Sequence, residues 1–440
     1  MIKEFSVENF RSIKGLQAIS FVPNKRMSKE NDDIVCLNVN ETTRLLKMGI
    51  LYGYNASGKS NILLAFDFLR DLVTDGKVTK NEKTGFTPFL LDPATVNAPG
   101  TFSLSFYIEG ILYEYTVTLD NDRIYSEVLQ YRPEGRKAVL FSRSFDREKR
   151  ISKISIGNKC GLSSADKVFL NKSTLENNTV LFSYQRSNIN SEVIEKVVSY
   201  FRDGIMPLVT PDAVLKQWSF QRLCNDRTQK DFYVDLMKRA DFQINDLEIK
   251  ELDVPVEEAD IKQFETFGAP SAVIEKLKKD KVMKQRQLLF VHKNSIGEFE
   301  IDSEEESLGT KRFFGLGGVL KALILKSRFV AIDEIEASLH PSLVNQFLKM
   351  FLMNSSQSQL FCSTHNQGLM DLDYMRNDMI WFCEKKEDGS SEYYSAQDFQ
   401  LHKNVSVSNF YRAGKLGAMP ILGSPLLEGE HIETAEKKSN

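Results

Sequence analysis

The sequence of 440 residues predicts an α/β fold with a mixed, mainly parallel sheet covered by helices, an antiparallel β-meander and a helical insertion. Three observations support this prediction. An apolar run, "LLKMGILYG", leads into a glycine-rich loop and then a helix. Residues 311–363 alternate between helical and strand patterns, as the chain of a parallel sheet does. Residues 101–145 alternate apolar and polar side chains, as antiparallel strands do.

The individual elements follow from these patterns in chain order. "IKEFSVENF" and "LQAISFVP" predict an opening hairpin, and "SNILLAFDFLRDLVTD" places its apolar residues on one stripe of a helix. Two runs joined by "EG", and a third after "DND", predict the meander. Apolar steps of three and four predict helices over residues 190–240, and the charge-rich residues 257–287 predict a solvated helical arm.

These patterns divide the chain into four regions. Residues 1–150 form an N-terminal lobe with the glycine-rich loop and the meander, and residues 151–299 form a mainly helical insertion. Residues 300–425 form a C-terminal lobe. Residues 426–440 end in the polar, charged run "EGEHIETAEKKSN", and we expect them to be disordered.

Composition limits the function classes. Lys and Arg total 57 against 60 Asp and Glu, a formal charge of -3, so the chain has no overall basicity that would indicate a nucleic-acid partner. Its five cysteines are scattered and odd in number, which favours reduced thiols and a cytoplasmic location. No apolar run approaches the roughly 18 residues of a membrane span, and the N-terminus lacks a signal-peptide pattern, so we expect no membrane association.

The loop "GYNASGKSN" matches the pattern G-x-x-x-x-G-K-[ST] through Gly53, Gly58, Lys59 and Ser60. Glycines let backbone N–H groups curl around phosphate oxygens at the start of a helix. Lys59 would bridge the β- and γ-phosphates, and the Ser60 hydroxyl would bind Mg²⁺. The sequence therefore predicts a nucleotide site here.

A second group of residues follows two later strands. "FVAIDE" delivers Asp333 and Glu334 to the carboxyl end of a buried strand, where ligands of α/β sheets bind. Asp333 suits a Mg²⁺ partner, and Glu334 can take a proton from an attacking water. His365, in "STHN", ends the next strand and would hydrogen-bond the γ-phosphate or the water.

A second anion-friendly helix start lies in "ESLGTKR", where Ser307, Gly309 and Thr310 open a predicted helix. Such a pattern also occurs as a plain helix cap. Because one chain already has its phosphate loop, this second start predicts a head-to-tail dimer in which each subunit closes over the nucleotide held by its partner.

The order of "GYNASGKSN", "ESLGT", "AIDEIEASLHP" and "STHN" resembles the ABC-type ATPases of the SMC, RecF and OLD group. More narrowly, it resembles the RloA-type ATPases of bacterial abortive-infection and restriction-linked loci. Around the phosphate loop, Asn55 and Asn61 match that group better than they match the loop of ABC transporters. The N-terminal run "VENFRSIKG" matches the start of the group's sequences, which implies that Arg11 lies near the nucleotide. The run "SNFYRAGKLGAMP" resembles the C-terminal end of RloA-like proteins.

This resemblance implies a set of roles for ATP and Mg²⁺ binding. It implies Walker A at residues 53–60, a degenerate signature at residues 307–310, Walker B at Asp333 and Glu334, a D-loop at residues 337–340 and a switch histidine at His365. The signature departs from the usual Leu-Ser-Gly-Gly-Gln, which bears on hydrolysis rate. The position of the inter-lobe glutamine stays open, with Gln130 in the right broad region.

Three functions remain open from the sequence, with either a protein effector or DNA as the partner. The first function is an ATP-driven switch in bacterial anti-phage defence that acts on a separate effector. Only 75 residues follow His365, too few for the Toprim nuclease that OLD proteins append, so the effector would be a nuclease encoded elsewhere. The second is a RecF- or SMC-like DNA clamp, with "KLKKDK" and "KQRQ" as its basic footprint. The third is a scaffold that binds ATP without turnover.

Overall fold

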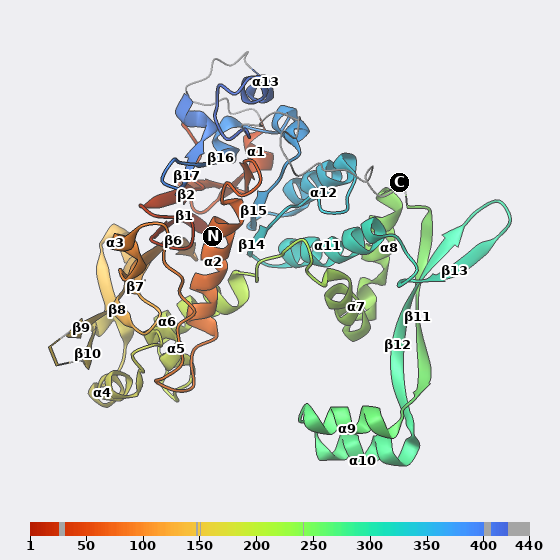
Figure 1. Ribbon diagram of the computed structural model, residues 1–440, viewed down its shortest axis with the longest axis horizontal. Helices are drawn as coiled ribbons and strands as arrows, with labels where there is room; N and C mark the ends of the chain where they lie inside the picture. The colour runs from red at the N-terminus through yellow and green to blue at the C-terminus, as the bar shows by residue number, and fades with distance from the viewer. Residues whose placement is uncertain (26–30, 147, 150, 241, 400–405, 421–440) are drawn as a thin grey trace, which may run out of the picture.

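The computed structural model describes residues 1–25, 31–146, 148–149, 151–240, 242–399 and 406–420 (Figure 1). The tail that we expected to be disordered, residues 426–440, lies outside the described residues. Figure 1 shows two lobes that meet around one helix, α2 (Lys59–Thr74), and a long arm that projects from the second lobe. No helix in the described part of the chain is long and apolar enough to cross a membrane.

The predicted parallel sheet is present, and it draws strands from both ends of the chain. Its strand order is β14-β15-β5-β16-β17, in which the first four strands run parallel and β17 returns antiparallel to β16. Strands β14, β15 and β5 are buried along their whole length, as strands covered on both faces require. The bounds are Phe329–Ile332 for β14, Gln359–Ser363 for β15, Met48–Tyr52 for β5, Ile380–Lys385 for β16 and Ser391–Ser395 for β17.

The second sheet is antiparallel and contains both the predicted opening hairpin and the predicted meander. Its strand order is β10-β9-β8-β7-β6-β1-β2. Buried and half-buried residues alternate along β6 and β7, and the predicted turn between them holds Glu109 and Gly110 at positive φ of 50° and 78°. The bounds are Ile2–Glu8 (β1), Gln17–Ser20 (β2), Gly100–Ile108 (β6), Ile111–Leu119 (β7), Ile124–Arg132 (β8), Ala138–Asp146 (β9) and Ile151–Ile156 (β10).

Helix α2 lies between the two sheets and joins their cores. Its Phe66 stacks on Phe5 of β1 at 3.9 Å between ring centroids and lies 4.9 Å from Phe329 of β14. Aromatic pairs at this spacing add to the free energy of apolar burial. The phosphate loop therefore enters a helix that is fixed from both sides.

Other helices cover the two sheets. In the C-terminal lobe, α11 packs on α12 and on α7. Against the antiparallel sheet, the buried carboxylate of Glu127 accepts hydrogen bonds from the Val180 amide at the start of α5. The bounds are Leu308–Leu325 (α11), Pro341–Asn354 (α12), Leu215–Asn225 (α7), Lys230–Arg239 (α8), Ser164–Ser173 (α4), Val180–Gln185 (α5) and Glu192–Ser199 (α6).

The arm corrects one of our expectations. Residues 257–287 do not form one helical arm: α9 (Glu258–Thr266) and α10 (Ser271–Asp280) form only its tip, and β12 (Val282–Lys293) already begins at residue 282. The stem is an antiparallel ribbon of β11 (Ile244–Pro255) and β12, with β13 (Glu298–Asp302) on the outer edge of β12 (Figure 1). Cross-strand pairing therefore overrides the helix propensity of Lys, Gln and Arg.

Five short α-helices and β-strands of the described residues lie outside the elements above. Helix α13 contains "VSNFYR" and packs beside the segment after β15. The remaining short elements are α1 (Asp32–Val35), β3 (Cys36–Asn38), β4 (Arg44–Leu46) and α3 (Pro93–Val96), and α13 spans Val407–Arg412. All five cysteines are free thiols, as the sequence predicted.

Candidate nucleotide-binding site

The phosphate loop joins β5 to α2 as predicted. Gly58 precedes the helix with a φ of 113°, and Ala56 also has a positive φ of 64°. The ammonium group of Lys59 donates to the carbonyl oxygens of Gly53 (2.9 Å) and Tyr54 (3.3 Å), so the side chain folds back over the loop. Burial lowers the pKa of Lys59, and the nearby Cys383 and the carboxylates described next oppose that shift.

The predicted acid pair follows β14, which is separated from β5 and its phosphate loop by one strand, β15. Asp333 is 7% exposed, and its carboxylate accepts a short hydrogen bond from the hydroxyl of Ser363. Ser363 in turn accepts from the Glu334 amide at 2.8 Å. Glu334 has a φ of 46° and an exposed side chain, so the backbone turns there and the carboxylate reaches the open edge of the sheet.

His365 lies at the same edge, just beyond β15. Its backbone amide donates to Glu336, which holds the start of the loop. Burial lowers the pKa of the imidazole, the positive charge of Lys59 lowers it further, and Glu336, Glu334 and Asp333 act in the opposite direction. Lys59, the acid pair and His365 thus follow the carboxyl ends of neighbouring parallel strands, and their charges influence one another.

The degenerate signature lies elsewhere on the chain's surface. Ser307 caps α11 by accepting a hydrogen bond from the Thr310 amide at 3.1 Å, and the two hydroxyls lie 2.8 Å apart. A side chain on Gly309 would come within 2.9 Å of the Ser338 carbonyl oxygen, so this helix start packs against the predicted D-loop. Within the described residues, neither Ser307 nor Thr310 is hydrogen-bonded to the phosphate loop.

The residues around the loop divide into exposed and supporting positions. Asn55, Ser60 and Arg11 have exposed side chains, and the guanidinium of Arg11 lies 5.6 Å from the Phe10 ring. Asn61 instead donates to the hydroxyl of Ser12 at 2.6 Å, a residue that sequence reasoning missed. Asn61 therefore supports the loop from the N-terminal segment, next to Arg11.

Gln130 belongs to the antiparallel sheet and lies away from the carboxyl ends of the parallel strands, where the acid pair is. It lies inside β8, paired with Glu114 of β7 and Val139 of β9, and β7 and β6 separate β8 from β1. With about 4.8 Å between neighbouring strands, β8 lies roughly 14 Å from β1. The segment beside the acid pair is residues 205–212, because the Asp333 amide donates to the Val209 carbonyl oxygen at 2.8 Å. The position of the inter-lobe glutamine, which the sequence left open, therefore does not fall on Gln130.

The C-terminal motif "SNFYRAGKLGAMP" packs against the segment that follows His365. Hydroxyls of Ser406 and Ser408 donate to Asp371, and Arg412 donates to Gln367 at 3.2 Å. Tyr411 stacks on Phe382 of β16 at 5.3 Å. Helix α13 therefore links the end of the His365 loop to the strand next to β5.

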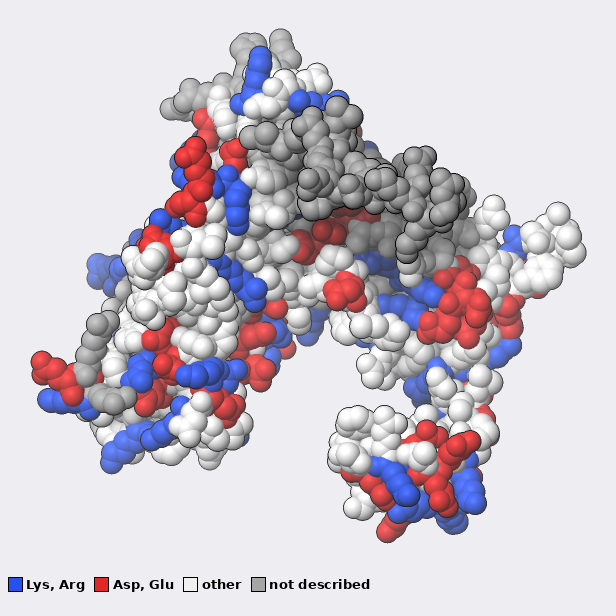
Figure 2. Space-filling view, viewed as in Figure 1, with Lys and Arg blue, Asp and Glu red and all other residues white. Residues whose placement is uncertain are grey.

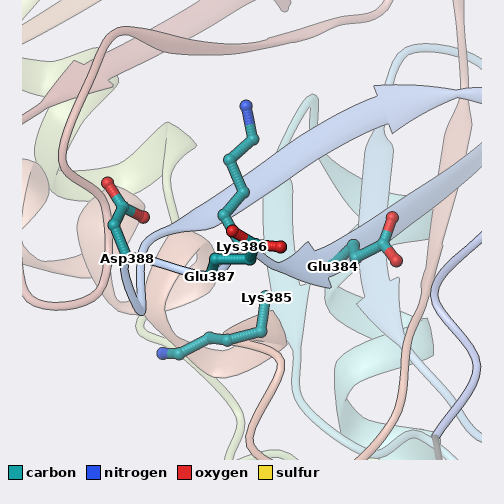
Figure 3. A pocket seen from close by; sticks show the side chains of 5 residues that line it. All are labelled: Glu384, Lys385, Lys386, Glu387 and Asp388. Carbon is teal, nitrogen blue, oxygen red and sulfur yellow. The ribbon is translucent and has the colours of Figure 1, made fainter.

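The turn between β16 and β17 forms a shallow pocket of about 520 Å³ behind the phosphate loop (Figure 3). It is lined by charged residues of the turn, Glu384, Lys385, Lys386, Glu387 and Asp388. Lys385 and Lys386 extend in different directions in Figure 3. The Lys385 amide donates to the Tyr54 hydroxyl at 3.1 Å, which ties this turn to the loop.

The donor set fits Mg²⁺ held together with a phosphate. Ser60 offers an exposed hydroxyl at the start of α2, and Asp333 offers a carboxylate whose partner is a serine hydroxyl. The described residues contain no cluster of three or more His, Cys, Asp or Glu that could hold a metal ion. Phosphate and water oxygens would therefore complete the coordination, as is usual for Mg²⁺.

The parallel strand order, the loop at the end of β5 and the acid pair at the end of β14 define a P-loop protein with the α/β head fold of ABC-type ATPases. The chain belongs to the family described as "AAA domain, putative AbiEii toxin, Type IV TA system", whose profile matches residues 50–371. That range includes the phosphate loop, the helix start at Ser307, the acid pair and His365. No curated protein matches the sequence.

Among solved structures, the chain is similar to three SMC head domains. The SmcHead bound to the C-winged helix domain of ScpA is 14% identical with a TM-score of 0.42, over 93% of this chain and 99% of that one. The SMC head domain from Thermotoga maritima is 12% identical with a TM-score of 0.39, over 90% and 98%. An Smc head with an extended coiled coil, bound to the C-terminal domain of ScpA derived from Pyrococcus furiosus, is 13% identical with a TM-score of 0.33, over 94% and 98%.

The lowered pKa of His365 predicts how acid affects the free energy of unfolding. Because the folded-state pKa lies below 6.5, the unfolded chain binds the proton more readily, so His365 makes the folded state less stable as pH falls below 6.5. We expect thermal unfolding between about pH 7.5 and 5.5 to show a smaller acid-induced loss in His365→Gln than in the wild type. The difference should shrink in a Lys59→Ala background, because the charge of Lys59 contributes to the lowered pKa of His365, and an unchanged difference would contradict that contribution.

Proposed function

We propose that this protein binds ATP with Mg²⁺ and hydrolyses it, that two copies close head-to-tail around the nucleotide, and that this cycle switches a separate effector in bacterial anti-phage defence. The observation that carries the proposal is the convergence of Lys59, Asp333, Glu334 and His365 at the carboxyl ends of neighbouring parallel strands. In phosphoryl transfer the protein mainly positions groups and neutralises charge, and this set supplies both.

Each side chain has a distinct task in the proposed reaction. Lys59, now folded onto the loop carbonyls, would turn to the β- and γ-phosphates, and the exposed Ser60 hydroxyl and Asp333 would hold Mg²⁺. Bound Mg²⁺ would neutralise phosphate charge. Glu334 would accept the proton of the attacking water, and His365, whose lowered pKa favours the neutral form, would orient that water or the γ-phosphate.

The place of the signature supports the head-to-tail arrangement. Ser307 is exposed and Leu308 is 71% exposed, so the start of α11 faces solvent. The first amides of a helix lack intrahelical partners and carry partial positive charge, which suits a phosphate. Ser307 is exposed and is not bonded to its own phosphate loop, so a nucleotide on a second copy is the ligand that would use this helix start, while Thr310, at 4% exposed, supports Ser307 from within.

A subunit-mixing experiment tests the shared site. Ser307→Asp keeps a good N-cap but places a negative charge where the partner's γ-phosphate would lie, so it should be inactive alone, as should Lys59→Ala. In an equal mixture, half of the dimers pair the two variants and contain one intact site of two, so about a quarter of wild-type ATPase activity should return.

Ser307→Asn is the matched control, because it caps the helix with a neutral side chain of the same size. It should keep most of the activity by itself. If the mixture stays as inactive as its components, while each variant melts at the wild-type temperature, the nucleotide is not shared between subunits and the dimer part of the proposal is wrong.

The family description supports the defence setting, since it names an AbiEii toxin and a type IV toxin–antitoxin system. The resemblance to RloA-type ATPases points the same way. We propose a protein effector that acts through the arm, which projects from the ATPase core (Figure 1). A cytoplasmic location belongs to the same proposal and agrees with the free thiols.

The charge distribution favours a protein partner over DNA. Lys and Arg are interspersed with Asp and Glu over the tip of the arm in Figure 2. In the basic runs that could have marked a DNA clamp, Lys278 pairs with Glu265 at 2.7 Å and Arg286 pairs with Glu251 at 3.2 Å. Paired cations offer a weaker electrostatic footprint to a phosphate backbone than a continuous basic face.

A further inference from the structure

Two hydroxyl groups of β17 donate hydrogen bonds to backbone carbonyl oxygens of the phosphate loop. The Ser391 hydroxyl donates to the Ser57 carbonyl oxygen at 2.5 Å, and the Tyr393 hydroxyl donates to the Gly58 carbonyl oxygen at 2.7 Å. Residues two apart on a strand share one face, so both hydroxyls reach the loop from the same side. Two consecutive carbonyl groups of the loop are thereby held toward β17.

The direction of these carbonyls fixes the direction of the phosphate-binding amides. In a planar trans peptide, the C=O of one residue and the N–H of the next point to opposite sides. Holding the Ser57 and Gly58 carbonyls toward β17 therefore turns the amides of Gly58 and Lys59 away from it, toward the open side where α2 begins. Amides with this direction are the groups that cradle phosphate oxygens.

The contact is buried and leaves little freedom. Ser57 is fully buried, Ser391 is 2% exposed and Tyr393 is 6% exposed. A side chain on Gly58 would come within 2.1 Å of the Ser391 hydroxyl oxygen, so only glycine permits this approach. The Cys383 thiol also lies 3.3 Å from the Ser57 carbonyl oxygen, but a thiol is the weaker donor.

A chain of hydroxyl donors connects this contact to the N-terminal segment. Asn61 donates to Ser12 at 2.6 Å, and the hydroxyl oxygens of Ser12 and Ser391 lie 2.8 Å apart. The Ser391 hydroxyl is within donating distance of both the Ser12 oxygen and the Ser57 carbonyl oxygen, and because it carries one proton, it donates to one of them at a time. Ser12, which accepts from Asn61, therefore lies directly beside the contact between β17 and the loop.

We propose that Ser391 and Tyr393 are positioning residues for the triphosphate, which act by aiming the Gly58 and Lys59 amides at its phosphate oxygens. The inference deepens the proposed function and rests on its nucleotide-binding part. It makes the C-terminal hairpin of β16 and β17 part of the binding site, although Ser391 and Tyr393 lie more than 330 residues from the loop carbonyls that they hold. Without the Tyr393 hydroxyl the Gly58 carbonyl keeps only the Asn61 amide (2.9 Å), and without the Ser391 hydroxyl the Ser57 carbonyl keeps only the Cys383 thiol. The loss of either hydroxyl therefore loosens the aim of the following amide.

The test compares Ser391→Ala and Tyr393→Phe with two matched controls in the full-length chain. Ser395→Ala and Tyr394→Phe make the same chemical changes on the same strand, and their hydroxyls bond the carbonyl oxygens of Ile380 (3.2 Å) and Leu416 (2.8 Å) instead of the loop. The measurements are the Kd for ATP with Mg²⁺, the steady-state kcat and KM, and the melting temperature without nucleotide.

We expect Ser391→Ala and Tyr393→Phe each to raise the Kd and KM for ATP by about 5-fold, and kcat at saturation to stay within about 2-fold of wild type. Both controls should keep the wild-type Kd at a melting temperature similar to that of the test variants. Ser391→Thr, which restores a hydroxyl, should recover most of the affinity.

Each contrary result has a separate meaning. If wild type binds ATP and the two test variants bind it as tightly as the controls, the positioning role is wrong while the proposed function stands. An equal loss of affinity in test and control variants would also overturn the positioning role, since it would reflect general weakening of the hairpin. If wild type itself does not bind ATP, the proposed function is wrong and this inference is wrong with it.

Discussion

Replacing Glu334 with Gln should lower ATP turnover by at least about 100-fold while leaving ATP binding intact, and should hold the protein as an ATP-bound dimer. The carboxylate is exposed at the open sheet edge, and its backbone is fixed by Ser363, so the amide variant keeps the geometry and loses only the proton acceptor. Phosphate release measures turnover, and light scattering coupled to size-exclusion chromatography with ATP and Mg²⁺ measures the dimer.

Glu336→Gln is the matched control for this experiment. Its amide oxygen can still accept the hydrogen bond from the His365 backbone, so turnover should change by less than about 3-fold. A Glu334→Gln protein that still hydrolyses ATP at the wild-type rate would remove Glu334 from the mechanism. A protein that loses turnover but remains monomeric with saturating ATP would contradict the head-to-tail closure.

Lys59→Ala should weaken ATP binding by at least about 100-fold without lowering the stability of the nucleotide-free protein. The ammonium group is buried against two loop carbonyls, and burial lowers its pKa, so the folded protein holds this charge at a cost. Removing it takes away the cation that faces the phosphates and also removes the cost of its burial. Isothermal titration gives the affinity, and thermal unfolding without nucleotide gives the stability.

Lys59→Arg separates charge from shape in the same position. Arginine keeps the positive charge, but its planar guanidinium does not fit a site built for a compact ammonium, so we expect intermediate affinity. Unchanged ATP affinity in Lys59→Ala would show that the loop does not hold the phosphates, whatever its sequence pattern. A large fall in melting temperature would instead identify Lys59 as a structural residue.

The parts of the site that were predictable are those with a local signature. The apolar run of β5, the glycines after it and the apolar stripe of α2 are contiguous, so the strand, loop and helix follow from the sequence alone. The same holds for Asp333 and Glu334 after β14 and for Ser307 at the start of α11. Each of these residues sits at a boundary between two periodic patterns.

The parts that were missed depend on which strands become neighbours. Ser363, Ser12, Ser391 and Tyr393 are ordinary residues in or beside strands, and nothing in their local sequence marks them. They reach the site because β15 lies between β14 and β5, and because β16 and β17 follow on the other side of β5. The position of the inter-lobe glutamine stayed open for the same reason, since the sequence position of Gln130 does not tell how far the meander extends from the site.

The arm shows the opposite failure, in which local propensity was misleading. Residues 282–287, "VMKQRQ", contain good helix formers, yet they pair residue by residue with β11. The adjoining Leu288 and Phe290 are buried, and they anchor the strand at the base of the arm. Pairing with a distant partner therefore decided the structure of the charged segment.

The position of β5 in its sheet has a consequence for biosynthesis. This strand is completed by residue 52, but both of its neighbours, β15 and β16, come from residues 359–385. At about 5–20 residues added per second, a nascent chain exposes both edges of this apolar strand for roughly 15 seconds or more before either partner leaves the ribosome. Strand β5 thus gains both of its neighbours only after residue 385 has been synthesised, and until then its exposed edges leave the growing polypeptide open to aggregation.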